Sequence, residues 1–234
     1  MKILGLIPAR GGSKGIPRKN IKLLHGKPLL CYTARAGLES TLLTKTILST
    51  EDGEIAQTGR DCGLEVPFLR PAELAEDQSP TLPVILHALD FLAERGEEYD
   101  AVCLLQPTSP FRDGEVIDAC IRLFMESSAD TLITIVPFPK EYSPYFMYCR
   151  DNDGVVRNYM GEKTKVVRRQ DVEQPYLREG SVYITSTKVL RGDKTIYGEK
   201  VVGYPMDPEK SINIDSMDDW QRAEEYLRKI HGEH

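Results

Sequence analysis

The chain has 234 residues, of which 41% are hydrophobic, and it carries a formal net charge of −6. This composition provides a full core for one large domain, so we expect a single domain over residues 1–234. No apolar run approaches the roughly 18 residues that a membrane-spanning helix needs, and an acidic chain lacks the basic face of a general nucleic-acid binder. We therefore expect neither a membrane nor a nucleic-acid partner.

The cysteines and the N-terminal residues bear on the location of the protein. The cysteines are Cys31, Cys62, Cys103, Cys120 and Cys149. They are odd in number and form no Cys-x-x-Cys pair, so neither a zinc site nor a disulfide framework is indicated. Arg10 and the glycines beside it interrupt the first apolar run, so no secretory signal is predicted there. We expect a cytoplasmic protein whose cysteines are buried, reduced thiols.

Short apolar runs alternate with amphipathic segments over the first 136 residues. We predict strands over residues 3–7, 46–49, 66–69, 101–105 and 131–136, and helices over 28–38, 54–61, 81–94 and 114–125. After residue 180 we predict two more strands, 181–185 and 200–204, and a final helix, 217–230, with Trp220, Ala223 and Leu227 facing inward. This alternation indicates an α/β fold with a Rossmann-like, mainly parallel sheet flanked by helices.

Residues 137–180 interrupt the alternation. They contain four prolines, several tyrosines and two hairpin-like stretches, at Asp153–Gly154 and Gly161–Glu162. This pattern predicts an extended β-ribbon inserted within the single domain. Apolar side chains such as Tyr142 and Tyr148 favour packing of the ribbon against a second subunit, which makes it a dimerisation insertion and the protein a homodimer. A mobile surface loop is the alternative.

The stretch from Ile7 to Asn20 combines glycines with cations directly after the first predicted strand. Its cations are Arg10, Lys14, Arg18 and Lys19, and its glycines are Gly11, Gly12 and Gly15. Glycine lets backbone N–H groups approach a ligand closely, and N–H groups together with cations in one loop form a polyphosphate cradle. The loop has neither a Walker A pattern nor a Gly-x-Gly-x-x-Gly pattern. A solvated basic loop is the alternative interpretation.

The charge distribution supports a phosphate cradle at this end of the chain. The first acidic residue is Glu39, and residues 1–38 contain eight lysines and arginines. An acidic protein with one cationic end is suited to a small anionic ligand there. The segment Gln106–Arg112 also follows a predicted strand, and ligands of α/β sheets bind beside the carboxyl ends of strands. We therefore expect the cationic loop and this segment to form one active site.

The stretch Pro8–Asn20 resembles the nucleotide-binding signature of the acylneuraminate cytidylyltransferases, or CMP–sialic acid synthetases, whose relatives include enzymes for legionaminic and pseudaminic acids. Further segments are similar to the family pattern in the same order: Val66–Leu74, Asp77–Thr81, Leu105–Pro110, Arg169–Gln170, Gly180–Tyr183 and Ser211–Asp215. The resemblance implies transfer of a cytidylyl group from CTP to the anomeric hydroxyl of a 2-keto-3-deoxy sugar acid. The products would be a CMP-sugar and pyrophosphate. The cofactor would be Mg²⁺.

The resemblance also implies roles for individual residues. It implies a nucleotide site of Ala9, Arg10, Gly11, Gly12, Ser13, Lys14, Lys19, Asn20, Arg70 and Thr81, sugar contacts from Gln106, Arg169 and Tyr183, and metal ligands Asp215 and Asn213. Arg10, Lys14 and Lys19 are the expected catalytic residues, because fixed cations stabilise the charge that accumulates on the phosphates as pyrophosphate leaves. Asn20 is expected to bind a ribose hydroxyl.

Structural alternatives remain for several of these positions. Arg70 could form a surface salt bridge, and Gln106 could cap its loop. Arg169 could be an ordinary surface charge of the ribbon, and Tyr183 could be a core residue. Asp215 could instead cap the final helix, although Ser216 competes for that position.

Two positions depart from the family pattern. Asn213 stands where the metal segment commonly has a second aspartate, and Phe146 stands where the ribbon often has a lysine that faces the sugar acid. The identity of the sugar acid and the choice between CTP and GTP therefore stay open. Another sugar or polyol acceptor, and a non-catalytic nucleotide-binding module, are the alternative functions.

Overall fold

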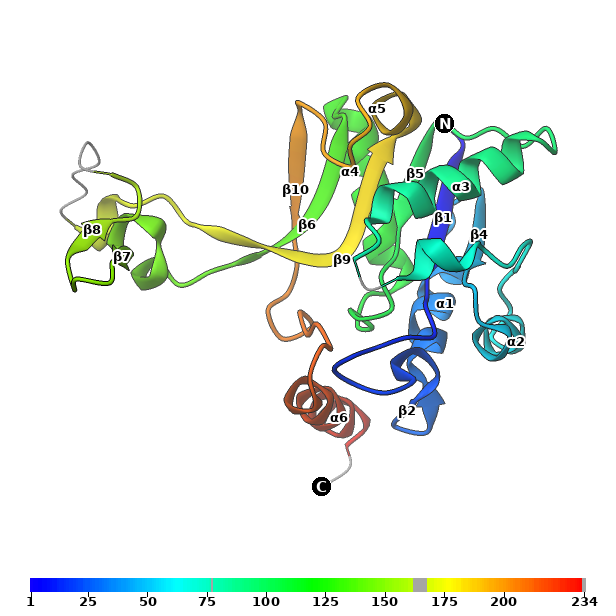
Figure 1. The fold of residues 1–234 in the computed structure, drawn as a ribbon, viewed down its shortest axis with the longest axis horizontal. Helices are drawn as coiled ribbons and strands as arrows, with labels where there is room; N and C mark the ends of the chain where they lie inside the picture. Colours follow the sequence, from blue (N-terminus) through cyan, green and yellow to red (C-terminus); the bar gives the residue numbers. More distant parts are fainter. Residues whose placement is uncertain (77, 162–167, 233–234) are drawn as a thin grey trace.

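The computed structural model describes residues 1–76, 78–161 and 168–232. Within these residues a six-stranded sheet lies at the centre, with strand order β10-β6-β9-β5-β1-β4 (Figure 1). Its strands are β1 (Ile3–Pro8), β4 (Lys45–Ser49), β5 (Ala101–Leu104), β6 (Thr131–Pro137), β9 (Tyr176–Ser186) and β10 (Val201–Pro205). Strand β9 is antiparallel to both of its neighbours, and the other paired neighbours are parallel. The α/β fold with a mainly parallel sheet is confirmed.

Helices cover both faces of this sheet. The helices α1 (Leu29–Glu39), α2 (Gly53–Asp61) and α4 (Gly114–Ser127) pack on one face, and α3 (Thr81–Ala93) and α5 (Thr187–Gly192) on the other. Strand β1 supplies both cores, because Ile3 and Ile7 face the first set of helices while Leu4 and Leu6 face the second. A strand covered on both sides is apolar throughout. No helix in the described parts of the chain has the length and apolarity to cross a bilayer.

Helix α6 (Met217–His231) packs below the sheet against the loop that follows β1 (Figure 1). Trp220, Ala223 and Leu227 are buried, as predicted, in a third apolar cluster that includes Ile16 of the loop. This cluster anchors the loop to the C-terminal helix. The short elements not yet named are β2 (Leu23–Leu24), β3 (Lys27–Pro28), η1 (Lys19–Ile21), η2 (Ala72–Ala75), η3 (Lys140–Tyr142), η4 (Pro144–Phe146), β7 (Tyr148–Arg150), β8 (Val156–Asn158) and η5 (Arg169–Asp171).

The prediction of a strand over residues 66–69 is wrong. Only an isolated parallel bridge forms there, between Ile47 and Glu65, with a hydrogen bond of 2.9 Å from the amide of Leu48 to the carbonyl of Glu65. Pro67 has no N–H group to continue a ladder, so the chain leaves the sheet edge directly after the bridge.

The prediction of five buried, reduced cysteines is also wrong in part. Cys103 and Cys120 are buried thiols, but Cys149 is exposed on β7. Cys31 on α1 and Cys62 at the end of α2 form a disulfide, with Cα atoms 5.5 Å apart. The pairing depends on the packing of α1 beside α2, which the scattered spacing does not reveal. Because disulfides are rare in cytosolic proteins, this bond gives the predicted cytoplasmic location no support.

Within residues 137–180, the described parts, 137–161 and 168–180, form an arm that projects away from the sheet (Figure 1). At its base β6 and β9 continue as a two-stranded ribbon, in which Pro137 pairs with Tyr176. Near its far end β7 and β8 form an antiparallel hairpin, in which Tyr148 pairs with Asn158. The described part of the arm is thus held by paired strands rather than being a plain surface loop. Its role in dimerisation stays a prediction.

Candidate active site

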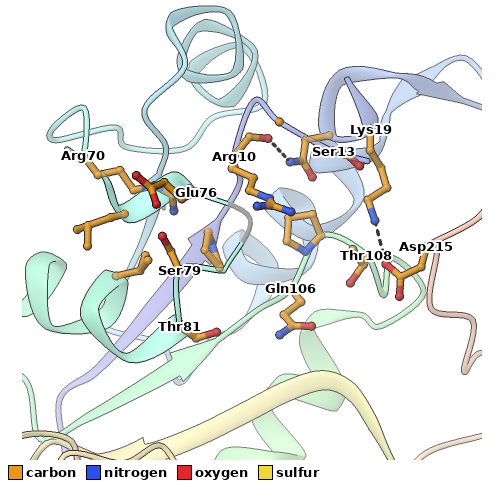
Figure 2. A pocket seen from close by; sticks show the side chains of 16 residues that line it. Arg10, Ser13, Lys19, Arg70, Glu76, Ser79, Thr81, Gln106, Thr108 and Asp215 are labelled. Carbon is orange, nitrogen blue, oxygen red and sulfur yellow. Dashed lines mark hydrogen bonds and ion pairs between the residues drawn. The ribbon is translucent and has the colours of Figure 1, made fainter. Parts of the chain in front are cut away.

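A cavity of about 340 Å³ lies at the carboxyl ends of β1 and β5 (Figure 2). Because β1 and β5 are parallel neighbours, the loops that follow them leave the sheet at the same edge. The lining residues are Pro8, Arg10, Gly12, Ser13, Lys19, Asn20, Arg70, Leu74, Glu76, Ser79, Thr81, Val84, Gln106, Pro107, Thr108 and Asp215. The structure therefore brings together the cationic loop and the Gln106 segment, as predicted.

The loop after β1 packs closely against two other parts of the chain. A Cβ atom on Gly15 would lie 2.1 Å from the backbone oxygen of Asp215, and one on Gly11 would lie 2.6 Å from a carboxylate oxygen of Asp52. Asp52 caps α2 by accepting from backbone amides, and it also pairs with Arg18. The hydrogen bond from Arg18 lowers the pKa of Asp52. Glycine is thus required where the loop meets the start of α2 and the segment before α6.

Lys19 connects the loop to the segment before α6. Its Nζ donates to the carbonyl oxygen of Ile214 at 2.7 Å and lies 3.0 Å from Oδ1 of Asp215. The Lys19 side chain is 11% exposed, whereas that of Asp215 is 65% exposed. Lys19 is therefore a fixed cation in the cavity wall, and Asp215 offers an accessible carboxylate beside it (Figure 2).

Asn20 shapes the loop from inside. Its buried amide nitrogen donates to the backbone oxygen of Arg10 at 2.9 Å. Asn20 also lines the cavity, so its contact with a ribose hydroxyl stays a prediction. Ala9, Gly11 and Lys14 belong to the same loop but are not among the lining residues.

Arg70 is 5% exposed, so the alternative of a surface salt bridge is wrong. Its Nη2 lies 3.0 Å from Oε2 of Glu51, and the other oxygen of Glu51 accepts from the amide of Gly11 at 2.6 Å. Burial lowers the pKa of Arg70, an effect that the charge of Glu51 opposes. Glu51 therefore joins the cationic loop after β1 to Arg70. No role was predicted for Glu51 from the sequence, although an acid just after a buried strand was an available signal.

The structure separates the three predicted sugar contacts. Gln106 lines the cavity. Arg169 is exposed on η5 in the arm. Tyr183 is buried in the core of β9, where burial raises its pKa. A Cβ atom on Gly180 would lie 3.6 Å from the Tyr183 hydroxyl and 3.8 Å from Oε1 of Gln106. Tyr183 is thus a core residue whose hydroxyl approaches the cavity floor, while Arg169 is remote from the cavity of its own chain.

Glu76 and Ser79 line the cavity, but the sequence analysis gave them no role. Both lie between Arg70 and α3; Ser79 belongs to the segment Asp77–Thr81 that resembles the family pattern, whereas Glu76 lies just before it. The resemblance was therefore an available signal for Ser79, whereas no pattern in the sequence distinguishes Glu76 from other polar residues before a helix.

Asp215 and Asn213 lie side by side before α6. The amide nitrogen of Asn213 donates to Oδ2 of Asp215, and its Oδ1 accepts from Ser109 at 3.5 Å. Ser216 caps α6 through a capping box with Asp219, so the capping alternative for Asp215 is wrong. No group of three His, Cys, Asp or Glu side chains suited to a metal occurs within the described residues. Mg²⁺ that binds with a nucleotide needs only one or two carboxylates, so these oxygens fit it.

Comparison with known proteins adds sequence evidence to this geometry. The family model described as cytidylyltransferase matches residues 4–233. The chain is 33% identical to the CMP-N,N'-diacetyllegionaminic acid synthase of Legionella pneumophila, over 97% of each chain. It is 30% identical to the pseudaminic acid cytidylyltransferase of Campylobacter jejuni, over 100% of this chain and 99% of that relative. It is also 32% identical to the N-acylneuraminate cytidylyltransferase of Escherichia coli, over 95% of this chain and 51% of that relative.

The fold is similar to that of solved structures as well. A CMP:2-keto-3-deoxy-manno-octonic acid synthetase complexed with CTP superposes with a TM-score of 0.72, covering 98% of this chain and 100% of that chain. The sequence identity to it is 12%, so this likeness concerns the fold alone.

Proposed function

Because the chain belongs to the cytidylyltransferase family, we propose that it transfers the cytidylyl group of CTP to the anomeric hydroxyl of a nonulosonic acid and releases pyrophosphate. The observation that carries this proposal is the cavity in which the cationic loop after β1 faces Gln106. The full-length relatives are named for legionaminic and pseudaminic acids. Those names support CTP over GTP, and a sugar acid over a polyol phosphate as the acceptor.

The cationic loop is suited to the triphosphate. Arg10 and Lys19 line the cavity on the side of this loop, and Lys14 is an exposed cation of the same loop. As the sugar hydroxyl attacks the α-phosphorus in line, the bond to pyrophosphate breaks and negative charge grows on the leaving oxygens. Cations that are already held in place stabilise that charge without a reorganisation cost. The contacts of Lys19 with Ile214 and Asp215 provide this fixed placement.

The opposite wall is suited to the nucleoside and the acceptor. Arg70 and Thr81 lie on the side where the nucleoside end of CTP would extend from the loop, and Gln106 lies on the cavity floor. Glu51 keeps Arg70 and the loop in one arrangement, since it binds both. The phosphate and nucleoside halves of the site are therefore positioned together.

We further propose that Asp215 and the amide oxygen of Asn213 hold Mg²⁺. A bound Mg²⁺ ion would neutralise part of the phosphate charge. Asp215 offers the accessible carboxylate at the cavity edge, and Lys19 holds that carboxylate at 3.0 Å. Because Asn213 is neutral, the site depends on the charge of the triphosphate more than a two-carboxylate site would.

We also propose that the arm joins two copies of the chain in a homodimer. Its support is a set of large apolar side chains that are exposed on the arm: Tyr142, Met147, Tyr148, Val155, Val156, Tyr159 and Met160. Such a concentration of exposed apolar surface is typical of an interface. In a dimer the exposed Arg169 would be available to the sugar site of the partner copy.

A pyrophosphate-release assay tests the function directly. CTP and GTP are each combined with a panel of nonulosonic acids, shorter keto-deoxy sugar acids and a polyol phosphate. We expect release only with CTP, and with at least one nonulosonic acid. Release with GTP alone would contradict the assignment of CTP as the nucleotide. Release with the polyol phosphate alone would contradict the assignment of a nonulosonic acid as the acceptor. No release with any pair would favour the non-catalytic module.

A further inference from the structure

A second groove, of about 290 Å³, lies next to the active-site cavity and shares a loop with it. Gln106–Thr108 line the first cavity, whereas Pro110–Asp113 line the second. The other walls of the groove come from the β2–β3 hairpin, α1 and the C-terminal half of α6. The two sites are therefore opposite sides of one structural unit, formed by the loop after β5 and the segment around α6.

Aromatic rings form one wall of this groove. The rings of Phe111 and Tyr226 have centroids 4.6 Å apart, and Tyr32 meets Phe111 edge to face at 6.5 Å. All three residues are partly exposed and line the groove. Aromatic faces and edges that remain accessible are suited to a planar ring, which can pack on them in an offset or edge-to-face arrangement.

The rim of the groove is cationic. The rim has three cations among its described residues, Lys27, Arg35 and Lys210, and two carboxylates, Glu39 and Asp113. Arg112 also lines the groove, but its side chain is buried. The carboxylates already pair with Arg35 and Lys210. Lys27 has no hydrogen bond or ion pair with any side chain or backbone group that the structure describes, beyond the backbone pairing of its own hairpin. The stacked rings of His25 and His231, 5.1 Å apart, complete the rim. The excess positive charge favours an anion.

We propose that this groove is a regulatory site for a nucleoside monophosphate, a planar ring that carries a phosphate. The ring would pack on Phe111 and Tyr226, and the phosphate would bind Lys27 at the rim. The amide of Ile214 donates to the carbonyl of Thr108 at 2.7 Å, so the shared loop and the segment that carries Asp215 move together. Occupation of the groove therefore acts on the active site. The CMP site goes beyond the proposed function, and only its effect on turnover rests on that function.

Calorimetric titration of the full chain with CMP measures the number of sites. We expect two CMP per chain for the wild-type protein, one in each cavity. Lys27→Glu, at an exposed rim position, should weaken the second site at least about tenfold, because like charges then face each other. The control is Lys188→Glu, which makes the same charge change on α5 at the opposite end of the molecule from α6 (Figure 1), and which should retain two sites.

Two further measurements separate the ring from the phosphate and the groove from the catalytic reaction. Tyr226→Leu should also weaken the second site, with folding checked by a melting curve, and inorganic phosphate should not displace CMP from the groove at equal concentration. In the pyrophosphate assay, CMP should lower the wild-type rate even at saturating CTP, but should only compete with CTP in Lys27→Glu.

CMP binding that Lys27→Glu leaves unchanged, whether at one site or at two, would overturn the proposal. Ready displacement by inorganic phosphate would show an anion site without selectivity for a ring. If no substrate pair releases pyrophosphate while two CMP sites persist, the proposed function fails and the regulatory site stands.

Discussion

The loop after β1 and the arm both extend from the sheet, but they are held in opposite ways. The loop, residues 9–20, is tied to its own chain at Asp52 and at Asp215, and its geometry is complete in one copy. The described part of the arm, residues 137–161 and 168–180, presents exposed apolar side chains such as Tyr148. If the proposed roles hold, binding of the triphosphate depends on contacts within one chain, whereas the arm becomes buried only against a second copy.

The largest expected effect comes from Asp215, where the loop meets the segment before α6. Asp215→Ala removes both the ion-pair partner of Lys19 and the accessible carboxylate of the site. We expect turnover to fall about 10³-fold, the upper range for loss of one fixed electrostatic group. Asp218→Ala, an exposed aspartate on the first turn of α6, is the control and should stay within about twofold. Full turnover of Asp215→Ala at any Mg²⁺ concentration would refute the assignment.

The close approach of Gly15 to the backbone of Asp215 provides a second test of the loop. Gly15→Ala places a Cβ atom 2.1 Å from a backbone oxygen, so the loop has to move. We expect a loss of about 1–3 kcal/mol in stability together with lower turnover. Gly53→Ala has open space around the new atom and serves as the control, measured by the same melting curves. A Gly15→Ala variant with wild-type stability and turnover would show that the loop is not tightly held.

The arm is tested by adding charge to its exposed apolar surface. Tyr148→Lys combined with Val156→Lys changes two residues that are 64% and 58% exposed. We expect sedimentation velocity to show a monomer at micromolar concentration. The melting temperature of the central sheet and its helices should change little. Met125→Lys, on the exposed side of α4, should remain a dimer. A wild-type protein that is monomeric and fully active at the same concentration would exclude the dimerisation role.

A smaller effect is expected at the neutral metal position. Asn213→Asp adds a carboxylate next to Asp215, so it should lower the Mg²⁺ concentration for half-maximal rate while changing the maximal rate less. A Mg²⁺ titration of the initial rate measures both quantities. An unchanged requirement for Mg²⁺ would indicate that residue 213 does not face the ion.

The smallest expected effect is the pH dependence of the contact between the loop and α2. The pKa of Asp52 is lowered, first by the hydrogen bond from Arg18 and then by backbone amides of α2. A lowered pKa means that this carboxylate stabilises the fold above its unfolded pKa, and that the contribution is lost as pH falls through the folded pKa. Between about pH 5 and pH 3 the wild-type melting temperature should therefore fall more steeply than that of Asp52→Asn. If the melting temperatures of the two proteins fall in parallel with pH, the pair of Arg18 and Asp52 contributes nothing to the stability of the fold.

Local patterns in the sequence predicted most of the helices and strands and the cationic character of the loop after β1. The inward face of α6, with Trp220, Ala223 and Leu227, follows from helical spacing and is buried as predicted. The strands β1 and β5 follow from continuous apolar runs, and their loops meet because parallel neighbours end at one edge. These features depend on side chains that are a few residues apart, so they can be predicted from the sequence without knowledge of the fold.

The tertiary structure alone decided the features that join distant segments. The burial of Arg70 depends on Glu51, nineteen residues before it in the chain. The antiparallel direction of β9 depends on the arm that precedes it, and the disulfide of Cys31 with Cys62 depends on the packing of two helices. Each of these contacts stabilises the fold only after the chain has closed a loop between distant residues. No local periodicity in the sequence indicates which distant group will be the partner.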